Sequence, residues 1–426
     1  MRINIVPALI ALAAGSHVAV AAAETGPAAQ KLAASPESIA AEKVVVIQNI
    51  VVTPAGNLGS ADGRHTLRLK GLVGAGYDSN IYATEEDVID DYYGRIMAGF
   101  ESVHRYNDSF SLGTDVLLDG KAYADNSDRN FVGGQARVKG AYKGEAITGN
   151  LALDYLLMDD PLIQTGERIK RSLYGANTVW VREMATGGIV VNADAHRTDY
   201  LEDQGGFVAE DNNYNSYVAG VRYIHQHNER TALWGRVGFG ADLYDNDNRF
   251  QDVTSVSAAV GGDFALGDRS TAFFEAGVDS RTYSDEFAPT YDDDSVIAPL
   301  LSIGLFYPMN TQGDVLKLRA FTDARNSFTA NAMQVVGGEF DVRHRMSEQV
   351  TAVINLSQVW LNDYGAAPGE DEASRSTFTP SLAVEYAMKD GVVLRGTGRW
   401  TISEASNSTE EDYDRTEVFV ETAFAF

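Results

Sequence analysis

The sequence predicts an all-β fold, a transmembrane antiparallel β-barrel of about 18 strands with short turns at one end and long acidic loops at the other. Three observations lead to this prediction. Runs of roughly ten to thirteen alternating apolar and polar residues recur from Thr66 to the end, as strands with one lipid-facing side require. The connections between the runs alternate in length, and the chain closes on a strand that ends in phenylalanine.

The closing strand, Glu417–Phe426, has the clearest pattern. Its apolar face consists of Val418, Val420, Thr422, Phe424 and Phe426, whereas Glu417, Glu421 and two alanines share the other face. The segment resembles the last strand of bacterial outer-membrane barrels, whose terminal phenylalanine is read by the barrel assembly machinery. This resemblance implies that Phe426 is an assembly signal and that the assembly machinery is a partner of the chain.

Composition and charge agree with many strands joined by polar turns. The chain has 40 Gly and 20 Tyr against 10 Pro and no Cys. No further apolar run of about 20 residues follows the N-terminal one, which excludes a helical membrane protein. The absence of cysteine excludes disulfides and thiolate metal sites. A formal net charge of -26 argues against binding to nucleic acid or to an anionic membrane surface, both of which require clustered Lys and Arg.

Residues 1–23 form a predicted signal peptide. Met1-Arg2 is a short positive region, Ile3–Val20 is apolar, and three alanines precede Glu24 as a cleavage site. The mature chain is therefore expected to begin near Glu24 and to reach the outer membrane as a multi-pass barrel.

Residues 24–63 are too few for a domain. They contain two short apolar runs, Val44–Ile47 and Ile50–Val52. The segment is predicted as a periplasmic lead-in, with pairing to a partner or a small plug inside the barrel as alternatives. The barrel itself is expected to span residues 64–426.

The connections give the orientation of the predicted barrel. Short ones, such as Lys143–Glu145 and Lys389–Gly391, carry the Gly and Asp typical of hairpin turns. Long ones include Asp78–Asp91, Met158–Arg171 and Leu361–Ser374. Short turns lie on the periplasmic side of bacterial barrels and long loops on the extracellular side.

The expected outer loops carry most of the acidic clusters, such as Glu85–Asp87, Asp245–Asp247 and Asp292–Asp294. Carboxylates there can bind divalent ions that bridge to lipopolysaccharide, or they are simply solvated charge, which is the interpretation we favour. Outer-membrane lipid and lipopolysaccharide are the expected surroundings. Tyrosines near the outer ends of the strands are expected at the membrane boundary: Tyr77, Tyr123, Tyr174, Tyr200, Tyr244, Tyr283 and Tyr413.

The face opposite the apolar one is expected to line the lumen. Its predicted cations are Arg68, Lys70, Arg95, Arg137, Lys139, Arg222, Arg236, Lys317, Arg319, Arg343, Arg395 and Arg399. Two interpretations have similar weight. The cations form an electrostatic ladder for an anionic chain, or they pair with inward carboxylates across a filled barrel.

Catalytic and metal-binding patterns are weak. The sequence contains no G-x-S-x-G, H-E-x-x-H or phosphate-loop motif. His225 and His227 have no carboxylate beside them and are interpreted as turn residues, and His196 with Asp194 and Asp199 is only a minor catalytic candidate. We therefore predict no enzymatic activity, no metal site and no cofactor.

One motif suggests a family. The stretch Gly74–Tyr82, read as G-A-G-Y-D-S-N-I-Y, resembles the opening of the "porin 2" type of β-barrel porins, which includes barrels encoded with exopolysaccharide systems. The resemblance implies export of an exopolysaccharide, with the polysaccharide and periplasmic export proteins as partners. A porin for passive diffusion of small solutes is the alternative, and a surface adhesion barrel is a third class. By themselves, Asp78, Ser79 and Asn80 are turn formers that cap a strand.

Overall fold

The structure is a computed structural model. It describes residues 45–47, 50–52, 55, 63–85, 88–161, 168–201, 212–245, 252–267, 270–284, 295–309, 314–325, 330–366, 374–406 and 412–426. The predicted signal peptide lies outside these residues, as do residues 24–44 and most of the acidic loop clusters.

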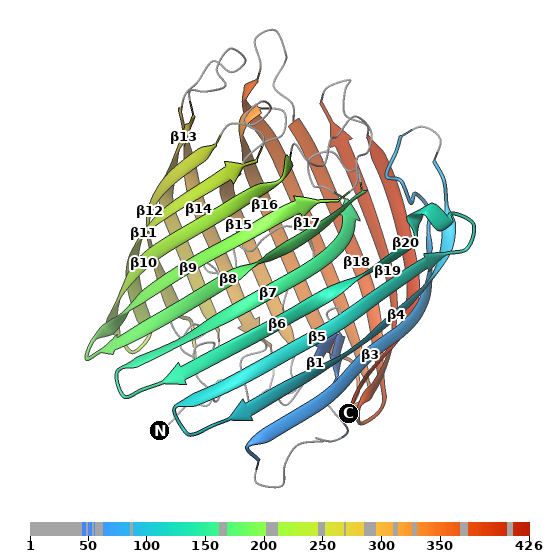
Figure 1. The fold of residues 1–426 in the computed structure, drawn as a ribbon, viewed down its shortest axis with the longest axis horizontal. Coiled ribbons are helices and arrows are strands. Elements are labelled where there is room, and N and C mark those ends of the chain that lie inside the picture. Colours follow the sequence, from blue (N-terminus) through green and yellow to red (C-terminus); the bar gives the residue numbers. More distant parts are fainter. Residues whose placement is uncertain are drawn as a thin grey trace.

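A closed antiparallel barrel dominates the described residues (Figure 1). Its 18 strands are β3 (His65–Asp78), β4 (Asp91–Arg105), β5 (Phe110–Tyr123), β6 (Phe131–Lys143), β7 (Ile147–Pro161), β8 (Arg168–Met184), β9 (Gly187–Tyr200), β10 (Tyr214–Asn228), β11 (Thr231–Tyr244), β12 (Val253–Ala265), β13 (Thr271–Tyr283), β14 (Ser295–Pro308), β15 (Val315–Arg325), β16 (Ala330–Arg345), β17 (Val350–Ala366), β18 (Ser374–Lys389), β19 (Val392–Ala405) and β20 (Tyr413–Ala425). Each strand pairs with its neighbours in sequence, and β20 pairs with β3 to close the ring. The predicted fold class and strand number are confirmed.

The short connections gather at one end of the barrel, shown at the bottom of Figure 1, where the C-terminus also lies. They include residues 106–109, 144–146 and 390–391. A short 3-10 helix, η1 (Ser127–Arg129), lies in the connection between β5 and β6 at the other end. The predicted alternation of short turns and long loops is thus present, and the short-turn end corresponds to the periplasmic side.

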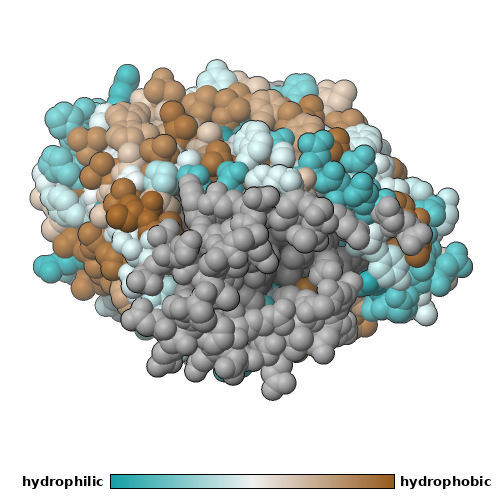
Figure 2. All heavy atoms as spheres, turned by 90° about the horizontal axis from the view of Figure 1, so that it is seen from above, coloured by the Kyte–Doolittle hydropathy of each residue, from teal (hydrophilic) through white to brown (hydrophobic). Residues whose placement is uncertain are grey.

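The two faces of the wall differ as the alternation requires. On β4, Tyr92, Ile96 and Phe100 are exposed, whereas Tyr93 and Met97 between them are buried. Figure 2 shows apolar residues spread over the outer surface of the wall between polar ones. An apolar outer face of this extent is stable only when lipid covers it, because exposing so much apolar area to water costs free energy. Within the described ranges, no helix is long and apolar enough to cross a membrane.

Two details differ from the sequence-based expectations. The loop expected at Met158–Arg171 is shorter, because the β7–β8 ladder continues to the pair Pro161↔Arg168. Five of the seven outer tyrosines face the barrel interior rather than lipid. Four of them are buried, namely Tyr123, Tyr200, Tyr244 and Tyr283, and the fifth, Tyr413, shares its strand face with Glu417. Their strand parity explains the difference. Tyr123, for example, shares its face with Asp119 and Lys121 and therefore points inward.

The two apolar runs before the barrel form a small hairpin of β1 (Val45–Ile47) and β2 (Ile50–Val52). Ile50 and Val52 are fully buried and pack against inward-facing apolar residues of five wall strands: Leu72, Met97, Leu117, Val393, Ala423 and Ala425. The backbone N–H of Ala55 also donates to the carbonyl of Ala425 at 3.1 Å. This hairpin lies against the inside of the wall, near the short-turn end (Figure 1).

Candidate functional site: the barrel interior

The structure places all twelve predicted lumen cations on the inward face of their strands. On β3, for instance, Arg68 and Lys70 flank the exposed, outward-facing Leu69. The inward side chains of neighbouring strands meet side by side, since residues paired across a ladder point to the same side of the sheet. Cations and carboxylates of different strands therefore come within reach of one another.

Most of these cations form ion pairs with inward carboxylates. The pairs are Arg68–Glu101 at 2.8 Å, Lys70–Asp115 at 2.6 Å, Arg95–Asp119, Arg137–Asp154, Arg236–Glu275 at 2.5 Å, Arg343–Glu385 at 2.5 Å, Arg395–Glu385 at 3.7 Å and Arg399–Glu417 at 3.4 Å. The interior is consequently a wall of mixed and largely compensated charge. This geometry favours pairing over an uninterrupted ladder of single positive charges.

The remaining predicted cations lie beside other partners. The guanidinium of Arg222 lies 4.4 Å from the ring centroid of Trp234, and that of Arg319 lies 4.5 Å from Phe321. Lys317 is opposite Asp341 in the β15–β16 register, and Lys139 is opposite Ala152 on β7. Arginine over an aromatic face gains a cation–π attraction while its charge stays in the interior.

Two of the twelve cations differ from the rest in their access to solvent. The side chains of Arg137 and Arg399 are 57% and 45% exposed, although both face inward. That of Lys70, in contrast, is 3% exposed. Arg137 and Arg399 lie near the middle of β6 and β19, well away from either strand end. The space beside these two arginines, in the middle of the barrel, is therefore not filled by protein atoms.

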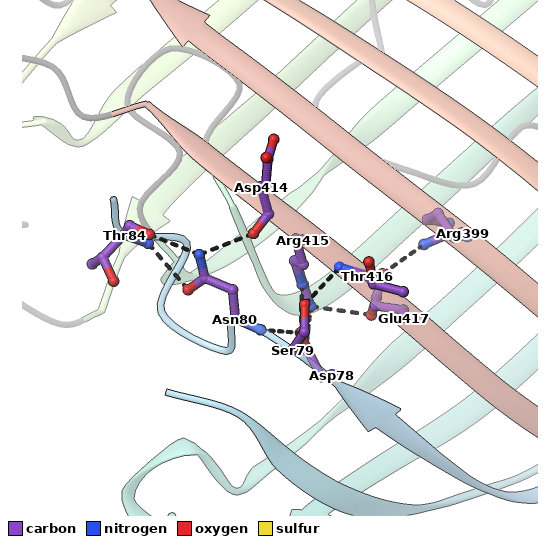
Figure 3. Close-up of polar contacts among 9 residues, drawn as sticks. All are labelled: Asp78, Ser79, Asn80, Thr84, Arg399, Asp414, Arg415, Thr416 and Glu417. Atoms are coloured by element: carbon purple, nitrogen blue, oxygen red, sulfur yellow. Dashed lines mark hydrogen bonds and ion pairs between the residues drawn. The ribbon is translucent and has the colours of Figure 1, made fainter. Parts of the chain in front are cut away.

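A third group of polar residues lies where the barrel closes, at the outer end of β3 and β20 (Figure 3). Arg415 donates two hydrogen bonds to the carboxylate of Asp78, at 2.8 and 2.5 Å, and one to Glu417 at 3.1 Å. The sequence-based selection of lumen cations did not include Arg415. Its spacing of two residues from Glu417 places both on one strand face, and this signal was available in the sequence.

The minor catalytic and metal candidates are not assembled into sites. His196 Nδ1 lies 2.7 Å from Asp194 on the inward face. Asp199, the third member of the candidate, lies on the opposite face and accepts a hydrogen bond from Arg197. No group of three or more His, Cys, Asp or Glu side chains in the described part of the chain is arranged to hold a metal ion.

Asp245 is one of the residues of the acidic outer loops that the structure describes. Asp245 follows β11 and accepts two hydrogen bonds from Arg197, at 3.0 and 2.5 Å. These hydrogen bonds hold the pKa of the Asp245 carboxyl below its ordinary value. The carboxylate is thus engaged with an arginine of the wall. The other members of this cluster, Asn246 and Asp247, lie outside the described residues.

Comparison with known proteins supports the fold. No family model matches the chain, and no curated protein sequence is similar to it. Among solved structures, it is similar to OccK2 (OpdF) of Pseudomonas aeruginosa, with a TM-score of 0.52 and 12% identity over 85% of this chain and 98% of that one. It is also similar to OccK3 (OpdO) of the same organism, with a TM-score of 0.50 and 11% identity over 84% and 96% of the two chains.

The similar proteins are outer-membrane porins, and at this level of identity the similarity establishes the fold alone. It agrees with the closed ring of strands and with the apolar outer face. The chain thus has the fold of a bacterial outer-membrane porin and is a multi-pass β-barrel of the outer membrane.

Proposed function

We propose that the chain is an outer-membrane channel through which small water-soluble solutes diffuse. The observation that carries this proposal is the solvent exposure of Arg137 and Arg399, which face inward halfway along their strands. A filled interior would bury both side chains as it buries Lys70. Barrels of this strand number are wide enough to leave an aqueous path between their side chains.

The charge arrangement supports polar solutes of small size. Inward carboxylates hold most of the cations in place, so the wall has fixed charges of both signs and no long stretch of one sign. The side chains of Arg137 and Arg399 are partly exposed, which lets them bind an anionic group of a passing solute. We therefore expect a modest preference for anions.

We further propose that the N-terminal hairpin narrows this path near the short-turn end. Ile50 and Val52 pack on an apolar patch of the inner wall, which is unusual for a water-filled lumen. This patch is a specific packing surface for the hairpin. Burial of two such side chains stabilises the docked position by about 3 to 6 kcal/mol. The described part of the segment therefore acts as a small internal plug that leaves part of the lumen open.

Export of an exopolysaccharide has less support. It rests on the resemblance of the Gly74–Tyr82 motif, and the similar porin structures do not add to it. One of them is a complex of OccK2 with glucuronate, a small carboxylate. A channel for small solutes therefore fits the fold better than a conduit for a polymer.

Reconstitution of the refolded full chain tests the proposal. In planar bilayers we expect stepwise increases in current, and in proteoliposomes we expect swelling in isotonic solutions of a neutral monosaccharide and of glucuronate. Protein denatured before reconstitution is the control. A correctly folded barrel that conducts no ions and admits neither solute would refute the channel.

Deletion of the gene separates the two functions. Slower uptake of small solutes with unchanged surface polysaccharide is the result expected for the channel. Loss of surface polysaccharide with normal uptake would instead establish the export function.

A further inference from the structure

The first outer turn of the barrel continues a strand pairing that otherwise stops. The ladder between β20 and β3 ends at the pair Glu417↔Asp78, although β20 begins four residues earlier, at Tyr413. Beyond this pair, the turn replaces the missing strand. Ser79 N–H donates to the carbonyl of Thr416 at 2.9 Å, and Thr416 N–H donates to Ser79 Oγ at 2.8 Å.

Asn80 fixes the shape of the turn and ties it to β20. Its side-chain amide donates to the carbonyl of Asp414 at 3.2 Å and to that of Thr84 at 2.7 Å, and its Oδ1 accepts from Thr84 N–H at 3.2 Å. The residue is fully buried. A buried amide without these partners would leave several polar groups unpaired, so no apolar residue of similar size can replace it without cost.

A buried ion pair lies directly beneath the turn. Asp78 is fully buried and receives two hydrogen bonds from Arg415, the geometry in which an arginine–carboxylate pair is strongest. Arg415 also contacts Glu417, which in turn contacts Arg399 at 3.4 Å. Asp78, Asn80, Arg415 and Glu417 thus link the two ends of the barrel sequence through buried polar contacts (Figure 3).

We propose that Asp78, Asn80 and Arg415 form a closure lock that holds the barrel seam shut at its outer end. Every other pair of neighbouring strands is joined by a turn or loop, whereas β3 and β20 meet only through contacts between residues more than 300 positions apart, such as Asp78 and Arg415. Strand ends fray unless they are tied down. The lock holds the two strands together where their ladder ends. Asp78, Ser79 and Asn80, the polar residues of the first-loop motif, thereby have a structural role at the seam.

The side chain of Ile81 adds an apolar anchor to the lock. It is fully buried against Tyr93 and Tyr123, with Phe419 of β20 packed at the edge of the same cluster. Tyr93, Tyr123 and Phe419 all face inward, so the turn folds over the inner side of the seam. The polar contacts therefore join the turn to β20, and the apolar contacts join it to β4, β5 and β20.

The seam variants Asp78→Asn and Asn80→Ala test the proposal in the full chain. Glu275→Gln is the matched control, because it breaks a similarly enclosed arginine pair on β13, away from the seam. We expect the seam variants to raise amide hydrogen exchange in β3 and β20 on the order of 100-fold, which corresponds to about 3 kcal/mol at 1.4 kcal/mol per tenfold change. The control should leave exchange at the seam unchanged.

A disulfide across the seam provides the rescue. Ala75 and Val420 are directly opposite in the β3–β20 register, and opposite residues of antiparallel strands lie within disulfide range. The chain has no cysteine, so the two thiols of the double variant Ala75→Cys/Val420→Cys have no other partner within the chain. Under oxidising conditions it should restore wild-type resistance of Asp78→Asn to unfolding by heat in detergent, and reduction should abolish this rescue.

The outcomes separate the lock from a general loss of stability. Wild-type exchange at the seam in both seam variants would overturn the proposal, as would an equal increase in the Glu275→Gln control. If Asp78→Asn yields no folded barrel, the same variant with the cysteine pair decides the question. Recovery of the barrel supports the lock, and failure to recover it overturns the lock.

Discussion

Replacing Glu385 with glutamine is expected to destabilise the barrel far more than an equivalent change at Asp154. The Glu385 carboxylate accepts a hydrogen bond from Arg343 at 2.5 Å and lies 3.7 Å from Arg395. It bridges two cations, and its side chain is 4% exposed. Glutamine keeps the shape of the side chain and removes its charge, which leaves two enclosed guanidinium groups facing each other.

The expected loss of unfolding free energy follows from how deeply each ion pair is buried. Removing one partner of a buried ion pair costs about 3 to 5 kcal/mol, whereas an exposed pair contributes about 0 to 1 kcal/mol. Arg137, the partner of Asp154, is the most exposed of the paired interior arginines, so Asp154→Asn should remain near the lower range. The difference between the two variants is therefore at least about 2 kcal/mol.

The assay is unfolding of the lipid-reconstituted barrel across a urea series. The four tryptophans report the transition by fluorescence, and heat-modifiable gel migration reports the folded fraction independently. Leucine at position 385 is a useful third variant, because it removes the charge without leaving polar groups of its own. Equal free energies of unfolding for Glu385→Gln and Asp154→Asn would refute the argument that the buried ion pair destabilises the barrel more when it is broken.

Three further predictions concern the path and the assembly. Replacing both Arg137 and Arg399 with glutamine should lower the anion-to-cation permeability ratio roughly twofold per site, the effect of about 0.5 kcal/mol per exposed charge, as measured by reversal potentials in a salt gradient. Replacing Ile50 and Val52 with aspartate should undock the N-terminal hairpin and free about 100 Å² of cross-section, the area of two strands side by side, which raises single-channel conductance. Deleting Phe426 should block assembly, measured as loss of the barrel from the outer-membrane fraction.

Each of these predictions has an outcome that contradicts it. An unchanged permeability ratio would mean that solutes do not contact the two arginines. Unchanged conductance in the hairpin variant, with the barrel folded, would show that the hairpin does not narrow the path. Normal amounts of the truncated chain in the outer membrane would remove Phe426 as an assembly signal, and replacement of Phe426 by tyrosine is the matched control.

Local properties of the sequence were sufficient to predict where the strands lie and which residues occupy each face. Side chains alternate with a period of two along any strand, so the pattern at Val418–Phe426 determines which residues meet lipid without knowledge of the neighbours. The same argument places Arg68 and Lys70 inward and gives the strand number. It would also have placed Tyr123 and Tyr283 inward, had parity been weighed above the tendency of tyrosine to lie at the membrane boundary.

Only the tertiary structure decided which residues meet. The pair Arg343–Glu385 joins β16 to β18 across the intervening β17, and its formation depends on the register of two separate ladders. Two further contacts depend on closure of the whole ring: the packing of Ile50 against five strands, and the ion pair of Asp78 with Arg415. Alternation along one strand carries no information about register between strands, because register is set by turn geometry and by the tilt that closes the barrel.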